Sequence, residues 1–435
     1  MSALQELFEG GRQCLPGGVC ASTRLNQALG HPAYVDHAVG ARVHDVDGKS
    51  WLDMSCGHGA ALLGHGHPAI QQALQRSAQL GICCAHDMPV HIDVAETLCG
   101  LIPCAERIRF TNSGSEATLH ALRLCRAASG RDKIIRFTGH FHGYHEHTFI
   151  GGHVPADRLD NPSAYRESPG IPEPLTQFIR AIPFNDLAAV ERVLSDEGDR
   201  IATLILEPVD FNSGGIPPQP GYLQGLRELT GKHGVLLFFD EIQTSFKKST
   251  GGAQADFDVT PDICTIGKSL GGGLPLSAIC GDADLMDRYQ PEGEVTHSGT
   301  FMAPLPSVLA GLAFLSQVTQ PSFYPDLLAE FERFYAEVDA MIERHRIPVQ
   351  VPRHGARFGV IVGLDHPPVD YRDTLVHRRD LWLAFIRHAF GNGVYFHDYG
   401  GGPCHHGFSV AHSREDIDRI LQVMDEAFGE IAVQF

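Results

Sequence analysis

Lys268 stands where a lysine could do covalent chemistry. It follows a short apolar run, 263–266, that predicts a buried strand, and three glycines follow at 271–273. Because burial disfavours the ammonium form, we expect the pKa of Lys268 to be lowered toward the neutral amine. Neutral lysine amines form Schiff bases with aldehydes. The glycines would let a bulky group approach the backbone closely.

Two other interpretations of this stretch compete. Gly267, Lys268 and the serine after them occur in phosphate-binding P-loops, but that motif needs a glycine five residues before Gly267, where this chain has Asp262. The second interpretation is a surface lysine beside a flexible glycine turn. This stretch alone leaves the second interpretation open, and residues elsewhere must decide.

Asp240 ends a second apolar run, 235–239. A carboxylate in that place is costly to bury without a partner. The protonated ring nitrogen of pyridoxal 5′-phosphate would be such a partner, and the pair would keep the ring charged as an electron sink. Ile242, two residues further on, would cover a face of the ring. A structural helix cap is the alternative for Asp240.

A helix start follows the strand that we predict over 108–110. Ser113, Gly114 and Ser115 would present backbone N–H groups and hydroxyl groups at the N-terminus of that helix. Such an N-terminus is a good cradle for a phosphate group. An ordinary serine cap is the alternative for the same residues.

Two more strand ends carry an aromatic or an amide side chain. Phe141 follows the strand predicted over 133–137 and lies in a glycine-flanked loop, where it could stack on a flat ring. A core phenylalanine is the alternative. Asn212 lies shortly after the strand predicted over 201–206, and its amide could hold a phenolate oxygen.

The alternation of strands and helices predicts an α/β fold with a mostly parallel sheet. Ligands of such sheets bind at the carboxyl ends of the strands. The polar strand ends described above should therefore lie close together. The predicted strands are 108–110, 133–137, 201–206, 235–239, 263–266 and 276–280, and helical runs at 116–128, 186–194 and 221–231 separate most of them.

The chain divides into three predicted parts. Residues 1–60 form an N-terminal arm, with a short amphipathic helix and a hairpin, and part of a small domain. Residues 61–305 form a large cofactor-binding domain. Residues 306–435 complete the small domain, which we expect to mix helices and short strands.

The composition excludes several classes of partner. The chain has 435 residues and a net charge of −18 without a basic run, which makes nucleic acid a poor partner. We find no apolar stretch long enough for a membrane span, and we do not expect the first residues to form a signal segment. The 11 cysteines contain no Cys-x-x-Cys pair, as expected of reduced thiols in a cytoplasmic protein. The 25 histidines show no zinc-site spacing, so we expect no metal.

Jointly, the motifs resemble those of class III pyridoxal-phosphate-dependent aminotransferases of fold type I, in particular the glutamate-1-semialdehyde aminomutase-like branch. The resemblance covers nearly the whole chain. It implies a large domain with a mostly parallel seven-stranded sheet and a smaller α+β domain from the N- and C-terminal segments. The motifs that carry it are Pro16-Gly17-Gly18-Val19, Asp45-Val46-Asp47-Gly48, Gly64-His65-Gly66-His67-Pro68, Ser113-Gly114-Ser115-Glu116-Ala117, Phe141-His142-Gly143, Glu207-Pro208-Val209, Asp240-Glu241-Ile242, Gly267-Lys268 and Gly299-Thr300.

The resemblance implies a role for each matching residue. Lys268 resembles the Schiff-base lysine that also moves the proton, and Asp240 resembles the partner of the ring nitrogen. Phe141 stands where the family usually has a stacking tyrosine, and Asn212 matches a residue near the ring oxygen. The other residues assigned to the pyridoxal 5′-phosphate pocket are Ser113, Gly114, Ser115, His142, Glu207 and Ile242.

Two further roles concern the partner subunit and the substrate. Thr300 resembles a threonine that reaches the phosphate from the other subunit of an obligate dimer, with active sites at the subunit interface. Arg24 falls where relatives of this branch carry an arginine for a substrate carboxylate, and an arginine fork suits a carboxylate bidentately.

The chain departs from the aminomutase pattern near its C-terminus. His405 and His406 precede Gly407-Phe408, where aminomutases have a glutamate, and they become candidate substrate contacts. The sequence therefore predicts a homodimeric aminotransferase that moves an amino group from a carboxylate-bearing amino acid to a keto acid. An intramolecular aminomutase and an amino acid racemase on the same scaffold are the alternatives.

Overall fold

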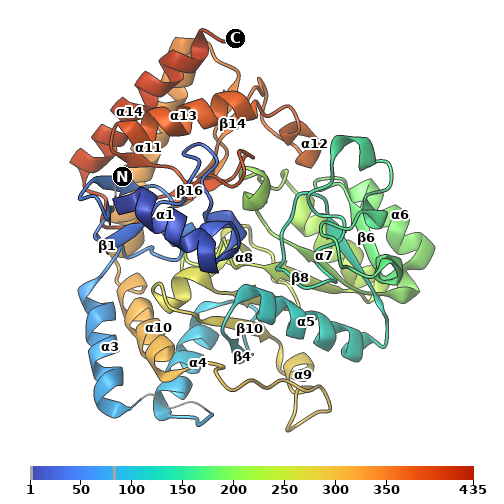
Figure 1. The fold of residues 1–435 in the computed structure, drawn as a ribbon. Helices are drawn as coiled ribbons and strands as arrows, with labels where there is room; N and C mark the ends of the chain where they lie inside the picture. Colours follow the sequence, from blue (N-terminus) through green and yellow to red (C-terminus); the bar gives the residue numbers. More distant parts are fainter. Residues whose placement is uncertain (1–2, 82–84) are drawn as a thin grey trace.

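The computed structural model describes residues 3–81 and 85–435, and a seven-stranded sheet lies at its centre (Figure 1). The strand order is β4-β10-β9-β8-β7-β5-β6. Only β10 is reversed, because it pairs antiparallel with both β4 and β9. The predicted α/β fold with a mostly parallel seven-stranded sheet is thus confirmed. The strands are β4 (Arg107–Thr111), β5 (Lys133–Phe137), β6 (Ile179–Ile182), β7 (Ile201–Leu206), β8 (Leu236–Asp240), β9 (Ile263–Ile266) and β10 (Ser277–Gly281).

The central strands are apolar on both faces because both faces are covered. β7 and β9 are buried along their whole length, as is usual for parallel strands between layers of helices. Phe238 and Ile263 pack with helix α5 (Gly114–Ser129) on one face. Leu237 and Phe239 point to the opposite face and join the larger core, since successive side chains of a strand alternate.

The remaining helices of this region lie around the sheet. Helix α10 packs against α3 and α4, and α6 packs against α7 (Figure 1). The longer helices are α3 (Pro68–Leu80), α4 (Pro89–Leu101), α6 (Leu187–Glu197), α7 (Tyr222–His233) and α10 (Leu305–Val318), and the short ones are α2 (Cys56–Gly59), α8 (Gly252–Asp256), α9 (Ala283–Met286) and α12 (Tyr371–Thr374).

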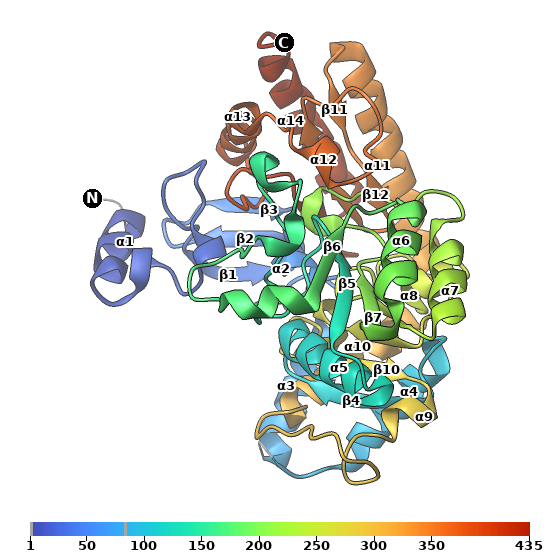
Figure 2. The ribbon, with the colours of Figure 1, turned by 90° about the vertical axis from the view of Figure 1, so that its right-hand side faces the viewer.

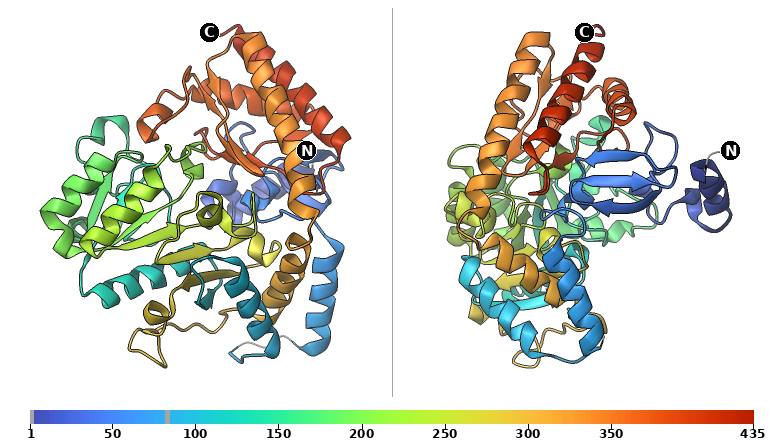
Figure 3. Two further views of the ribbon diagram at one scale, coloured as in Figure 1. Left: turned by 180° about the vertical axis from the view of Figure 1, so that it is seen from behind. Right: turned by 90° about the vertical axis from the view of Figure 1, so that its left-hand side faces the viewer.

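A second sheet joins the two ends of the chain. Its order is β1-β2-β3-β15, in which β15 (Val394–Tyr395) pairs in parallel with β3 (Ser50–Asp53). The C-terminal helices pack against one another above it, while α1 stands away from the body of the molecule (Figures 2 and 3). The other elements here are α1 (Ala3–Cys14), β1 (Val35–Val39), β2 (Arg42–Asp45), α11 (Phe323–His345), α13 (Arg379–Gly391) and α14 (Arg414–Ala432).

Two small antiparallel sheets complete the fold. One pairs β11 (Val349–Gln350) with β14 (Ile361–Val362). The other has the order β12-β13-β16, with β13 (Arg357–Gly359) between β12 (Arg353–His354) and β16 (His405–Gly407). Its register sets Arg357 opposite Gly407. This pairing brings Arg357 and His405, which are 48 positions apart in the chain, into contact.

Several boundaries differ from the sequence predictions. Strand β6 was not predicted, because its run Ile-Arg-Ala-Ile is short and interrupted by a charge. Strands β8 and β10 lie one residue further along than predicted, so Asp240 is itself the last residue of β8. The domain boundaries at residues 60 and 305 stay predictions. Within 3–81 and 85–435, no helix combines the length and the apolarity that crossing a membrane requires.

Candidate active site

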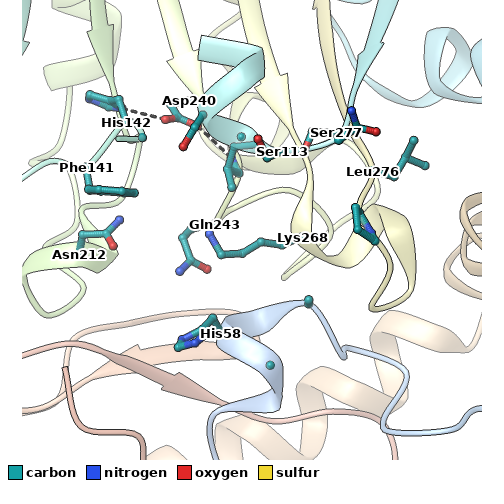
Figure 4. Close-up of a pocket in the computed structure, with 18 of the residues that line it drawn as sticks. His58, Ser113, Phe141, His142, Asn212, Asp240, Gln243, Lys268, Leu276 and Ser277 are labelled. Carbon is teal, nitrogen blue, oxygen red and sulfur yellow. Dashed lines mark hydrogen bonds and ion pairs between the residues drawn. The ribbon is translucent and has the colours of Figure 1, made fainter. Parts of the chain in front are cut away.

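The carboxyl ends of the strands open onto a cavity of about 600 Å³. Lys268, beyond β9, and Asp240, at the end of β8, both line it, and Figure 4 shows Lys268 extending between Asp240 on one side and His58 on the other. The structure therefore brings most of the predicted site residues together. Those that line this cavity are Ser113, Gly114, Ser115, Phe141, His142, Glu207, Asn212, Asp240, Ile242 and Lys268.

Lys268 has an unusual backbone and a perturbed amine. Its φ is +46°, a left-handed conformation that a residue other than glycine adopts at a cost of about 1–2 kcal/mol. Burial lowers the pKa of Lys268 from 10.5 to about 8, although the negative charges of Asp240 and Glu207 oppose the change. The direction agrees with the sequence expectation, and it makes a neutral amine accessible near neutral pH.

Asp240 is held by three donors and still faces the cavity. Its Oδ2 lies 2.8 Å from Nδ1 of His142, and its Oδ1 accepts from Thr265 Oγ1 at 3.0 Å and from the Ile242 N–H at 3.2 Å. Burial lowers the pKa of His142, so a neutral ring donates Nδ1–H to the carboxylate. A carboxylate that is 4% exposed and fixed in this way can still accept from a cationic N–H.

The start of α5 offers an anion cradle. Ser113 caps the helix, its hydroxyl accepting from the Glu116 N–H at 3.2 Å, and the N–H groups of Gly114 and Ser115 fall among those without a partner inside the helix. A methyl group on Gly143, whose φ is +106°, would lie 2.7 Å from Ser115 Oγ. The loop therefore fits this helix end only with glycine, and the helix dipole favours a phosphate there.

Glu207 and Asn212 form a buried pair at the side of the cavity. Nδ2 of Asn212 donates to both carboxylate oxygens of Glu207 at 2.8 and 2.9 Å, and the Phe141 N–H donates to Oε1 at 2.8 Å. Burial, together with the nearby Asp210, raises the pKa of Glu207 well above its usual range. The amide hydrogens that we expected to meet a ring oxygen are therefore turned toward Glu207.

Phe141 and Ile242 supply apolar surface beside the cavity. Phe141 packs edge-on against Tyr144, with the ring centroids 4.9 Å apart, and its own ring borders the cavity (Figure 4). Ile242 follows Asp240 by two residues and lines the same space. Flat apolar walls beside a carboxylate and an anion cradle suit a planar heterocycle that carries a phosphate.

Four predicted residues lie elsewhere. His405 lines an adjoining cavity of about 770 Å³, which also reaches Lys268. His406 is buried among Phe358, Trp382 and Phe396. Arg24 is exposed in a short 3₁₀ turn, although its neighbours Ser22 and Thr23 line the adjoining cavity, and Thr300 is exposed in a loop. The single chain thus leaves Arg24, His406 and Thr300 away from both cavity linings.

Sequence reasoning missed several lining residues, among them His58 and Gln243. His58 lies in a run of left-handed residues after β3, and it borders both cavities. Gln243 lies one turn beyond Asp240, and its side chain lies beside the end of Lys268 (Figure 4). His58 lies between two glycines, Gly57 and Gly59, and only the fold shows that this segment reaches the strand ends.

The donor set fits pyridoxal 5′-phosphate. It combines an amine of lowered pKa, a buried carboxylate, a helix N-terminus and apolar walls around one cavity. It does not resemble a metal centre, because the described part of the chain contains no cluster of three or more His, Cys, Asp or Glu side chains able to hold a metal ion.

Comparisons with known proteins agree with this chemistry. The family model for class III aminotransferases matches residues 26–428. An omega-transaminase from Sphaerobacter thermophilus has a similar structure, with a TM-score of 0.91, 29% sequence identity and coverage of 99% of this chain and 98% of that chain. A beta-phenylalanine aminotransferase from Variovorax paradoxus gives a TM-score of 0.89 and 27% identity over 99% of this chain and 94% of that chain.

A third similar structure is a glutamate-1-semialdehyde-aminomutase from Pseudomonas aeruginosa PAO1, with a TM-score of 0.87, 26% identity and coverage of 98% of this chain and 94% of that chain. Its presence among the neighbours fits the branch that the motifs resemble. Because the family model spans nearly the whole chain, the protein belongs to the class III aminotransferase family and is a pyridoxal 5′-phosphate-dependent aminotransferase.

Proposed function

We propose that Lys268 is the amine that binds the cofactor covalently and moves the proton during amino transfer. The observation that carries the proposal is the placement of Lys268 and Asp240 on one cavity. When bound, the cofactor supplies an electron sink for the pair released at the amino-bearing carbon of the substrate. Nζ of Lys268, neutral in part because its pKa lies near 8, takes the proton from that carbon.

The other residues of the cavity hold the cofactor in place. Asp240 keeps the ring nitrogen protonated, and His142 and Thr265 orient its carboxylate. The N-terminus of α5, with Ser113, Gly114 and Ser115, binds the phosphate group. Phe141 and Ile242 cover the ring, and Glu207 with Asn212 borders its oxygen side.

The donor is an amino acid with a carboxylate, and the acceptor is a keto acid. Arg24 remains our candidate for the carboxylate, because the turn that carries it borders the adjoining cavity through Ser22 and Thr23. His405 lines the same cavity and is a candidate contact for the second group of the substrate. His406 does not line this cavity, so it would act on the substrate through its neighbour His405. A donor screen that includes ω-amino acids and β-amino acids tests the substrate class, since one similar structure is named an omega-transaminase and another a beta-phenylalanine aminotransferase.

The working form is a cytoplasmic homodimer. Support for a second subunit comes from exposed apolar side chains, Phe301 at 62% and Ile92 at 60% exposure, and from the exposure of Thr300 beside Phe301. Thr300 would complete the phosphate site of the other subunit. Support for a reducing compartment comes from the nine cysteines of the described ranges, all of which are free thiols.

The decisive experiment replaces Lys268 by alanine. The variant should purify without the visible absorbance of covalently bound cofactor and without turnover, whereas Lys248→Ala, an exposed lysine nearby, should keep both. Borohydride reduction followed by peptide mass mapping should place the cofactor on Lys268. Full activity of Lys268→Ala would defeat the proposal.

An aminomutase is the second candidate, because an enzyme of that name is among the similar structures. The two reactions differ in whether the deaminated product leaves or is re-aminated in place. Single-substrate turnover without any keto acid would favour the mutase, and inversion at one carbon without amino transfer would favour a racemase. Turnover that stops after one equivalent and resumes with a keto acid supports the transaminase.

A further inference from the structure

One histidine of the adjoining cavity faces an oxygen acceptor with each of its ring nitrogens. His153 lies in the loop between β5 and β6, its side chain is 38% exposed, and it lines the cavity that also reaches Lys268. Its Nδ1 lies 3.5 Å from Oε2 of Glu167, and its Nε2 lies 3.3 Å from the backbone carbonyl oxygen of Asn212. Because a carboxylate and a carbonyl only accept, each nitrogen needs a hydrogen of its own. Turning the ring over would set two carbons against the same oxygens, so the geometry favours a charged imidazolium.

The groups that face His153 come from several elements. Glu167 belongs to the same loop, Asp210 to the turn after β7 and His140 to the loop after β5. The ring of Tyr371 on α12 meets the ring of His153 edge-on, with the centroids 6.0 Å apart. Although burial lowers the pKa of His153, the hydrogen bond and the charge of Glu167 outweigh it and raise that pKa above its ordinary value of 6.5.

Glu167 does not neutralise this cluster, because a second cation lies behind it. Arg136 is 1% exposed, and its Nη1 lies 3.8 Å from Oε1 of Glu167. The hydrogen bonds of the guanidinium go to backbone carbonyl oxygens, among them that of Ile150 at 3.1 Å. Glu167 is ionised, since His153 and Arg136 lower its pKa to about 2 although burial opposes them. Two cations and one carboxylate leave a net charge of about +1 near pH 6, where Asp210 is mostly neutral because burial raises its pKa to about 7.

The other side chains that line the two cavities offer little positive charge. Among the described residues, no arginine lines either cavity. His58, His142 and His405 line them, and burial lowers the pKa of all three. The contact from Nε2 of His153 to the carbonyl is longer than the usual range of about 2.7–3.2 Å. A carboxylate that enters the cavity can therefore replace the carbonyl as the acceptor, and a charged pair binds more strongly.

We propose that His153, with Arg136 behind it, forms an anion site of the adjoining cavity and binds a carboxylate of the amino donor and of the keto acceptor. That carboxylate is either the one beside the amino-bearing carbon or a second acidic group further along the substrate, and both suit the same N–H donor. The proposal deepens the proposed function and rests on it for the identity of the reactants.

The first test measures the binding of glutarate to the holoenzyme by calorimetry. Glutarate is ionised at both ends from pH 6 to 9, so its own charge stays constant. His153→Gln removes the cation, and the Kd of glutarate at pH 6 should rise about tenfold, as expected for the loss of a hydrogen bond to a charged group. His345→Gln is the matched control. It removes a partly buried histidine that lies 2.7 Å from Asp425, at the contact of α11 with α14, and should leave the Kd unchanged.

The pH profile separates a charge from a merely structural role. His153 is protonated below its raised pKa and loses the proton above it, while Asp210 gains a negative charge over the same range. The affinity of the wild type for glutarate should therefore fall about tenfold more between pH 6 and 9 than that of His153→Gln, which keeps only the part from Asp210. His153→Lys keeps the cation and should retain most of the affinity at pH 9.

Kinetics with the donors that the wild type converts show which carboxylate is bound. If His153 binds the carboxylate beside the amino-bearing carbon, KM in His153→Gln should rise about tenfold for every amino acid donor and not for simple amines. If it binds a second acidic group, only donors with two acidic groups should lose affinity. An equal rise for simple amines would overturn the proposal.

The calorimetric result decides the proposal independently of turnover. Equal Kd values of glutarate for the wild type and His153→Gln at pH 6 would overturn it. If His153→Gln does not fold, His153→Lys decides: tight binding at pH 9 supports the anion site, and a fall as large as that of the wild type refutes it. A wild type that converts no donor would refute the proposed function, whereas the same titration of glutarate would still test the anion site.

Discussion

Replacing Lys268 by methionine should stabilise the cofactor-free protein at neutral pH. Burial lowers the pKa of Lys268 from 10.5 to about 8, even with Asp240 and Glu207 nearby. At pH 7 the amine is protonated in both the folded and the unfolded chain, so the folded chain holds a charge that its surroundings disfavour. Each pH unit between the two pKa values corresponds to about 1.4 kcal/mol, which makes the penalty about 3 kcal/mol.

The two pKa values of Lys268 determine how its effect on stability changes with pH. The penalty is complete below the folded pKa of about 8. Between pH 8 and 10.5 the folded chain has released the proton of Lys268 while the unfolded chain still binds it, so the stability of the wild type rises with pH. The advantage of Lys268→Met in free energy of unfolding should therefore fall to about 1 kcal/mol near pH 9.5.

Thermal unfolding of the cofactor-free protein measures this difference. With an unfolding entropy of about 2 cal/mol/K per residue, about 3 kcal/mol raises the Tm of a chain of this length by about 3 °C at pH 7. Lys248→Met, at an exposed lysine, should leave the Tm unchanged. A Lys268→Met variant that is no more stable than the wild type at pH 7, or whose advantage persists unchanged at pH 9.5, would refute the argument from burial.

Three further changes probe the site. Asp240→Asn removes the charge that holds the ring nitrogen protonated, and since a hydrogen bond to a charged group contributes about 1.5–3 kcal/mol, the cofactor Kd, measured by fluorescence titration, should rise by about ten- to a hundredfold. Gly143→Ala places a methyl group 2.7 Å from Ser115 Oγ at a φ of +106° and should weaken phosphate binding and lower the Tm, whereas Gly170→Ala, at a φ of +94° with open space around it, should leave cofactor binding intact. Arg24→Ala should raise KM for carboxylate-bearing donors and not for simple amines; an equal rise for both would remove Arg24 as the carboxylate site.

Much of the site could be predicted because its reactive side chains lie at or just after the ends of strands. Lys268, Asp240 and Ser113 each stand after an apolar run, and parallel strands place their carboxyl ends at one edge of a sheet. The local patterns therefore specified both the α/β fold and the cofactor cavity. Boundaries were less secure: β6 is short and carries a charge, and Asp240 extends β8 because its backbone still pairs with Thr265.

What the sequence alone determined is the set of reactive groups and the edge at which they meet, because both depend on the order of residues along single strands and turns. Only the tertiary structure decided which side chains form the wall opposite them. Arg357, His405 and Gln243 come from distant segments, and no local pattern relates them. Their contacts arise from the pairing of β13 with β16, which depends on how the C-terminal segment packs against the large sheet.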